Sequence, residues 1–163
     1  MTAKAKNQHS VSEHNFHLIR AAEHTITRLE HMGLHYDFGG GRNHGSTPTM
    51  PRDLERGGDG GDCSWLAGVV CVKLGQRIVW PGSTFSLATE GVEGRGKIFT
   101  MHIKNLADPA ESHVILEFAH PGHTRWAECG GRDNPTSTGG PAWFHPTADR
   151  IAEFPIKRHF RGF

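Results

Sequence analysis

A glycine-rich segment in the first half of the chain constrains the fold more than any other feature. Residues 39–63 contain eight glycines, including the run Gly39–Gly41. Because glycine loses the most conformational entropy when it is ordered, such a segment disfavours helices and strands. We therefore expect a loop, and one that allows another backbone to approach closely.

Apolar residues at helical spacing lie on both sides of this loop. Before it, they recur between positions 18 and 32, behind a capping-box pattern that starts at Ser10. This pattern predicts an amphipathic helix of about five turns. After the loop, Asp62 is a suitable N-cap and Gly75 a suitable C-terminal stop. These two residues predict a buried helix over about residues 63–74.

The second half of the chain has the pattern of strands. Residues 98–103 and 113–118 alternate in hydrophobicity, and residues 124–129 follow a turn that contains Pro121 and Gly122. The last two segments are expected to form an antiparallel hairpin, and the apolar tail to add another short strand. The predicted fold class is α+β, with N-terminal helices packed on a small antiparallel sheet.

Length, charge and cysteine content limit the organisation and the partners. At 163 residues the chain is about one domain long, and we expect a flexible arm over residues 1–11 and a single domain over residues 12–163. The net charge of +1 gives no strong field for nucleic acid or an anionic membrane. No apolar run indicates membrane insertion or a signal peptide. Three cysteines cannot pair completely, which favours synthesis in a reducing compartment.

Cys63 is the candidate nucleophile, because the predicted helix begins at this residue. The helix dipole and the free backbone N–H groups stabilise a thiolate there by up to about 2 kcal/mol in favourable geometry. The same N–H groups can bind the oxyanion that forms when a thiolate attacks a carbonyl. Cys71, among valines within the same helix, is expected in the core, and Cys129 beside the site.

The strands supply candidates for a proton acceptor and for a group that orients it. His113 opens a predicted strand, with parity opposite to the apolar face of that strand, and is the candidate base. Glu128 lies near the end of the next strand, where a hairpin brings it to the His113 end, and is the candidate orienting group. The alternative bases are His102 and His145.

Histidines at positions 17, 24 and 31 repeat every seven residues along the first predicted helix. Residues with this spacing lie about 10 Å apart along a helix axis, which is too far to share one ion. We expect the stripe to be a solvated or interface-facing edge, and we expect no metal and no cofactor.

Four motifs occur in a characteristic order. They are Tyr36–Gly41, Asp62–Ser64 at a helix start, His113–Val114 at a strand start and Glu128–Gly131. Together they resemble the motifs of the NlpC/P60 family of papain-like cysteine peptidases. The resemblance extends from about Leu18 to the C-terminus, and it implies a papain-like NlpC/P60 fold.

The resemblance also implies a hydrolase that cleaves amide bonds in the peptide stems of bacterial peptidoglycan without a cofactor. Cys63 would be the nucleophile, His113 the general base and then the general acid, and Glu128 the orienting group. The hydroxyl of Tyr36 would lie by the sulfur, and the N–H of Cys63 would help to bind the oxyanion. The residues expected to position the substrate are Tyr36, Asp62, Ser64 and Trp65.

Three positions depart from the family pattern. Trp65 stands where the family has glycine, and it is expected to narrow the cleft or form its wall. The middle strand is preceded by Gly96–Ile98 instead of Gly-Asp-Leu, and Glu128 stands where histidine is more common. A structural virion protein with a degenerate peptidase fold is therefore an alternative. An acyltransferase or amidase that acts on a small thioester or amide is another.

Two further segments, Gly94–Asn105 and Gly140–Trp143, resemble the versions of this family in actinobacterial phages. The implied role is local degradation of the cell wall, either at the tail tip during entry or by a lysin. The protein would then lie in the virion tail or, before release, in the host cytoplasm. The expected partners are peptidoglycan peptides and other phage tail proteins.

Overall fold

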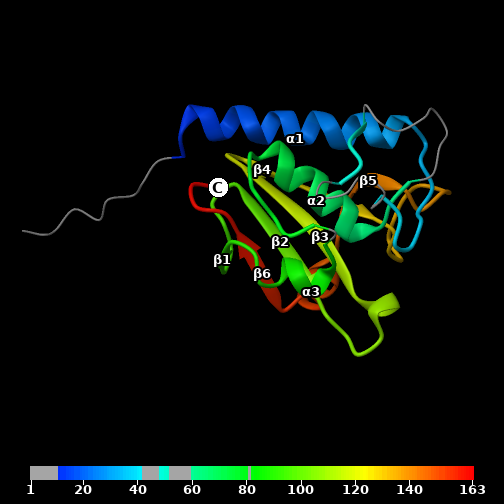
Figure 1. Ribbon diagram of the computed structural model, residues 1–163. Helices are drawn as coiled ribbons and strands as arrows, with labels where there is room; N and C mark the ends of the chain where they lie inside the picture. Colours follow the sequence, from blue (N-terminus) through cyan, green and yellow to red (C-terminus); the bar gives the residue numbers. More distant parts are fainter. Residues whose placement is uncertain (1–10, 42–47, 52–59, 81) are drawn as a thin grey trace, which may run out of the picture.

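The computed structural model describes residues 11–41, 48–51, 60–80 and 82–163, which form an α+β fold (Figure 1). The helices are α1 (Glu13–His31), α2 (Cys63–Lys73), α3 (Thr84–Leu87) and α4 (Ala148–Ala152), with a 3-10 turn η2 (Pro109–Glu111). The strands are β1 (Val92–Glu93), β2 (Phe99–Lys104), β3 (His113–His120), β4 (His123–Cys129), β5 (Pro141–Phe144) and β6 (Ile156–His159).

These strands form one antiparallel sheet in the order β1-β6-β2-β3-β4-β5, which confirms the predicted combination of helices and an antiparallel sheet. α1 lies along β5 and against α2, and α2 lies over β3 and β4 (Figure 1). The C-terminus returns to the start of α1, where the side-chain amide of Asn15 donates a hydrogen bond of 2.8 Å to the carbonyl of Gly162.

The main core lies between α1, α2 and one face of the sheet. Val114, Leu116 and Phe118 of β3 face this core. Ile115, between them, belongs to a smaller cluster on the opposite face, which also contains Phe154. The alternation predicted for this strand is therefore confirmed, and it places Glu117 on the face away from α2, where it contacts His102.

The two long helices begin at different kinds of cap. α1 begins after Ser12, whose side chain accepts a hydrogen bond of 3.2 Å from the backbone N–H of Asn15. Ser10, where the capping box is expected, lies outside the described residues, and Ser12 takes the capping position. α2 begins after Asp62 and ends before Gly75, whose φ is +71°, as predicted.

Asp62 joins the glycine-rich loop to the start of α2. One carboxylate oxygen accepts hydrogen bonds from the backbone N–H of Trp65 (2.8 Å) and the hydroxyl of Ser64 (2.7 Å). The other accepts a hydrogen bond of 3.1 Å from the backbone N–H of Gly39. Gly61 lies against the Trp65 ring, where an added Cβ would come within 2.3 Å. The absence of a side chain at Gly61 therefore allows the Trp65 ring to pack directly against the backbone of the loop.

The predicted hairpin of β3 and β4 is confirmed, and Gly122 in its turn has a φ of +86°. The sequence does not predict β1, α3 or α4, because these elements have two to five residues and show no period. The apolar tail forms two strands rather than one. β5 pairs with β4, and β6 crosses back to lie between β1 and β2.

Residues 1–10 of the predicted arm lie outside the described residues, and Val11 packs against the main core.

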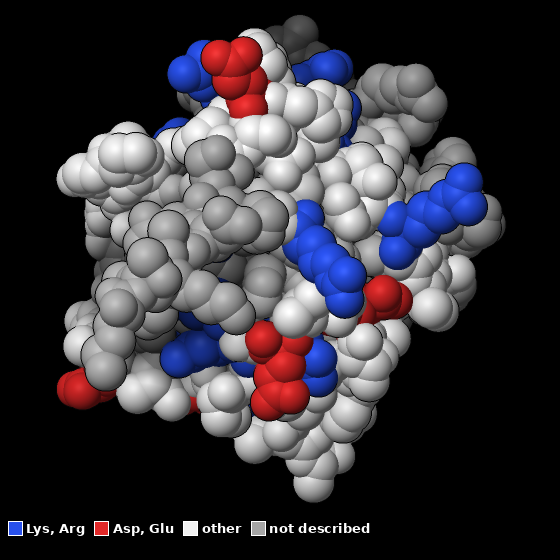
Figure 2. Space-filling model, turned by 90° about the vertical axis from the view of Figure 1, so that its left-hand side faces the viewer, with Lys and Arg blue, Asp and Glu red and all other residues white. Residues whose placement is uncertain are grey.

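No helix in the described ranges is long and apolar enough to cross a membrane. Figure 2 shows basic and acidic side chains interspersed over one face, in keeping with the net charge of +1.

Replacing Asp62 by alanine should lower the free energy of unfolding by roughly 2–4 kcal/mol, because it removes a buried N-cap with at least three hydrogen bonds. The matched change Ser12→Ala removes an exposed N-cap bond and should cost about 1 kcal/mol or less. Urea unfolding of the two variants measures the difference. Equal losses would contradict the role given to Asp62.

Candidate active site

Cys63 is the first residue of α2, which is the position predicted for the nucleophile. Its side chain is 6% exposed and belongs to the main core, so access to the sulfur is narrow. At the first helical position, the dipole and the unpaired backbone N–H groups favour an anion. The fold therefore provides a site for a thiolate at this residue.

His113 is the first residue of β3 and forms hydrogen bonds with both Cys63 and Glu128. Its Nε2 lies 3.2 Å from Oε2 of Glu128. Because this ring nitrogen contacts the carboxylate, Nδ1 is the nitrogen that remains for the thiol. The structure thus brings together the three predicted catalytic residues, from α2, β3 and β4.

The surroundings of His113 act on the pKa of its imidazole in opposite directions. Burial lowers this pKa, because a charged ring is poorly solvated there. The hydrogen bonds with Cys63 and Glu128, together with the charges of these two groups, raise it more. The pKa of His113 is therefore about 9 instead of 6.5. A protonated imidazole beside a thiol stabilises the thiolate.

Glu128 is fully buried, and a glycine leaves room for its contact with His113. Oε2 of Glu128 contacts the imidazole, whereas Oε1 has no hydrogen-bond partner among the described residues. Gly131 lies against this pair, and an added Cβ would be 2.5 Å from Oε2 of Glu128 and 3.0 Å from Nε2 of His113. Its φ of +92° also favours glycine. A residue with a side chain would therefore collide with the His113–Glu128 pair at position 131.

A cavity of about 810 Å³ opens beside His113. Tyr36 lines it next to Gly130, where an added Cβ would be 2.5 Å from the Tyr36 ring. Cavities of this size hold drug-sized ligands. The charged residues that line it are Lys104, Glu111, Arg132, Arg150 and Glu153.

The residues predicted to position the substrate lie in different surroundings. Tyr36 lines the cavity, whereas Asp62 and Ser64 are buried and bonded to each other at the helix start. Trp65 does not form a wall of the cleft, and this prediction is wrong. Its side chain is fully buried, and its indole N–H donates a hydrogen bond of 2.9 Å to the carbonyl of Thr49. The third position of α2 faces the glycine-rich loop and not the cavity.

The alternative bases have other surroundings. His102 is buried on β2, and its Nε2 lies 2.7 Å from Oε2 of Glu117. His145 is exposed. The histidine stripe of α1 is exposed, as predicted, and no group of three or more potential ligands in the described ranges is placed to hold a metal ion. His113 is therefore the histidine that the structure pairs with the candidate nucleophile.

The other two cysteines are fully buried. Burial raises the pKa of the Cys71 thiol far above its usual range, and its predicted place in the core is confirmed. Burial, and then the charge of Cys63, raise the pKa of Cys129. The Sγ of Cys129 donates a hydrogen bond of 3.1 Å to the carbonyl of Gly61. Cys129 is thus a neighbour of the site, as predicted.

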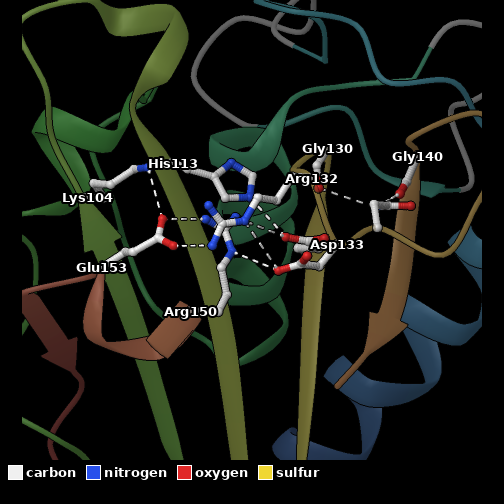
Figure 3. A network of polar contacts seen from close by, with 10 residues as sticks. Lys104, His113, Gly130, Arg132, Asp133, Gly140, Arg150 and Glu153 are labelled. Atoms are coloured by element: carbon white, nitrogen blue, oxygen red, sulfur yellow. Dashed lines mark hydrogen bonds and ion pairs between the residues drawn. The ribbon is translucent and has the colours of Figure 1, made fainter. Parts of the chain in front are cut away.

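Arg150 of α4 is a residue of this site that the sequence does not predict. Its side chain is 4% exposed, and its Nη2 lies 3.9 Å from Oε2 of Glu128. Figure 3 shows the guanidinium between Glu153 and Asp133, pointing toward His113. Because α4 has five residues, no periodic pattern marks this position. A basic residue within the apolar tail does not single out this position, because the tail also contains Lys157, Arg158 and Arg161.

His113 should make the folded state more stable at neutral than at alkaline pH. Because its folded-state pKa of about 9 exceeds 6.5, its contribution is complete below pH 6.5 and is lost as the pH rises through 9. His113→Gln should therefore destabilise most at pH 6 and least above pH 9, with a difference on the order of 2–3 kcal/mol in urea unfolding. The exposed control His145→Gln should show no such dependence. A cost of His113→Gln that does not change with pH would contradict this expectation.

Comparisons of the chain with family models, with curated proteins and with solved structures found no match. The positions of the side chains in the fold are therefore the basis for assigning a function. The site is the imidazole of His113, which is bonded to the thiol of Cys63 and the carboxylate of Glu128 and lies beside a cavity.

Proposed function

We propose that this protein is a cysteine peptidase that hydrolyses amide bonds in peptidoglycan stem peptides. The observation that carries the proposal is the imidazole of His113, which is bonded to both Cys63 and Glu128 at the edge of a cavity. A nucleophile, a base and a group that orients the base are the parts that covalent hydrolysis of an amide requires.

The reaction begins when the Cys63 thiolate attacks the carbonyl carbon of the scissile amide. A C–S bond forms, and the carbonyl oxygen takes a negative charge, to which backbone N–H groups at the start of α2 donate hydrogen bonds. The protonated His113 gives its proton to the leaving nitrogen as the C–N bond breaks. This step releases an amine and leaves a thioester on Cys63.

Water then hydrolyses the thioester. The neutral imidazole of His113 removes a proton from water, whose oxygen attacks the thioester carbonyl. The C–S bond breaks, the carboxylic acid leaves, and the thiolate and the imidazolium are restored. Throughout both steps, Glu128 orients the ring and favours its protonated form.

The arrangement of the elements supports a papain-like fold of the NlpC/P60 type. A helix with a cysteine at its start packs on an antiparallel sheet, in which a histidine opens β3 and an acidic residue lies near the end of β4. The order of the motifs resembles that of the family, whose substrates are peptidoglycan stem peptides. By the same resemblance, we extend the proposal to a phage enzyme that opens the wall at the tail tip or as a lysin.

Replacing Cys63 by alanine should lower the rate of stem-peptide cleavage by at least about a thousandfold, because the covalent step requires the sulfur. The matched change Cys71→Ala, in the core of the same helix, should retain activity. Mass spectrometry of the products from purified peptidoglycan and defined muropeptides measures the rate and identifies the scissile bond.

The same products separate the proposal from its alternatives. Hydrolysis adds water to the acyl fragment, whereas transfer to a second amine gives a larger product. Equal activity of Cys63→Ala and the wild type would contradict the proposal. Inactivity of both on peptidoglycans of every cross-link type would also contradict it, and would favour a structural role in the virion.

Replacing Glu128 by glutamine should lower kcat by roughly 10- to 100-fold with a smaller change in KM, because the ring of His113 loses a charged partner. Glu117→Gln is the matched control, since Glu117 is also buried and also bonded to a histidine, His102. Steady-state kinetics on a defined muropeptide compare the two. A decrease in kcat of similar size in both variants would contradict the role of Glu128.

A further inference from the structure

Arg150 places a buried positive charge beside the carboxylate that orients His113. The side chain of Arg150 is 4% exposed and that of Glu128 is fully buried, and their Nη2 and Oε2 atoms lie 3.9 Å apart. The imidazole of His113 contacts the same Oε2 atom at 3.2 Å. One carboxylate oxygen therefore lies between two cationic groups that come from different elements.

Arg150 is itself held from several sides (Figure 3). Its Nη1 donates a hydrogen bond of 2.9 Å to Glu153, and its Nε lies 3.4 Å from Oδ2 of Asp133. The guanidinium also lies 4.9 Å from the centre of the Phe154 ring, and the His113 ring packs on this phenyl group at 6.0 Å. These contacts fix the position of the charge, because rotation of the guanidinium would break them.

Glu128 has few groups that compensate its charge. Its Oε1 has no hydrogen-bond partner in the described part of the chain. Without Arg150, Glu128 loses one of the two cationic groups that hold its Oε2 atom in place. A carboxylate that is held less firmly orients the imidazole of His113 less well, and the imidazole then stabilises a thiolate at Cys63 less well. Arg150 can therefore act on the sulfur through two intermediate side chains.

We propose that Arg150 is a positioning residue, which acts through Glu128 and His113 to keep Cys63 in its thiolate form. This inference rests on the proposed function for the roles of those three residues. The titratable or charged groups that contact His113 or Glu128 are Cys63 of α2 and Arg150 of α4, besides the pair itself. The cavity beside His113 is lined by further titratable or charged residues, namely Tyr36, Lys104, Glu111, Arg132 and Glu153.

A second trio of the same composition provides an internal control. Arg95 and His102 both contact the buried carboxylate of Glu117. Burial raises the pKa of Glu117, but the hydrogen bonds from His102 and Arg95 lower it more. The contacts described for this trio do not include Cys63. A change at Arg95 therefore tests the general effect of removing an arginine from a buried carboxylate.

Alkylation of Cys63 by iodoacetamide at pH 6.5 measures the thiolate and needs no cell-wall substrate. Mass spectrometry of the Cys63 peptide from the full chain gives the rate. We expect Arg150→Gln to slow alkylation at least about tenfold, and Arg150→Lys to restore it to within about threefold of the wild type. Arg95→Gln should leave the rate unchanged. Circular dichroism establishes that each variant is folded.

Two results would overturn the role of Arg150. One is a folded Arg150→Gln variant that reacts within about twofold of the wild type, and the other is an equal loss in Arg95→Gln. If Arg150→Gln does not fold, the double change Asp133→Asn and Glu153→Gln loosens the arginine at two partly exposed anchors. It should slow alkylation roughly threefold, and an unchanged rate would overturn the proposal.

The wild-type rate separates failure of this inference from failure of the proposed function. A wild type that reacts much faster than free cysteine, with an unaffected Arg150→Gln, contradicts only the role of Arg150. A wild type that reacts no faster than free cysteine contradicts the proposed function itself.

Discussion

The paired hydrogen bonds of the His113 imidazole are the interaction on which the rest of the site depends. Burial alone would keep this ring neutral, yet the thiol and the carboxylate bonded to it bring its pKa to about 9. The three groups come from three different elements. α2 supplies the sulfur at its start, β3 the imidazole at its start, and β4 the carboxylate near its end. If the imidazole of His113 moved, Cys63 and Glu128 would both lose the charge that stabilises them.

The parts of the fold that can be predicted from the sequence carry long periods or clear stop signals. α1, α2 and the β3–β4 hairpin lie close to their expected ranges, because apolar spacing, Asp62, Gly75 and Gly122 mark them. The short elements β1, α3 and α4 carry no such marks. Tertiary contacts decide their positions, as where β6 inserts between β1 and β2. The N-cap of α1 also differs from the expected residue, because the sequence has two serines near its start, Ser10 and Ser12, and either can cap a helix.

The same distinction applies to the site. Cys63, His113 and Glu128 can be predicted because each lies at or near the end of an element, where hairpins and helix starts bring side chains together. The burial of Trp65 depends on how the glycine-rich loop packs, and a pattern of residues does not show this. Arg150 reaches Glu128 from α4, a five-residue helix between β5 and β6 that shows no periodic pattern. Charged partners that are distant in the sequence are therefore the features of the site that the sequence alone does not predict.

The central claim is that a protonated His113 faces a Cys63 thiolate, and NMR titration of the His113 ring tests it most directly. We predict that the ring of the wild-type protein titrates with a pKa of about 9. In the variant Cys63→Ser, the midpoint should fall by at least about one pH unit, because the charge of the thiolate is removed. A wild-type midpoint near 6.5, or one that Cys63→Ser leaves unchanged, would contradict the claim.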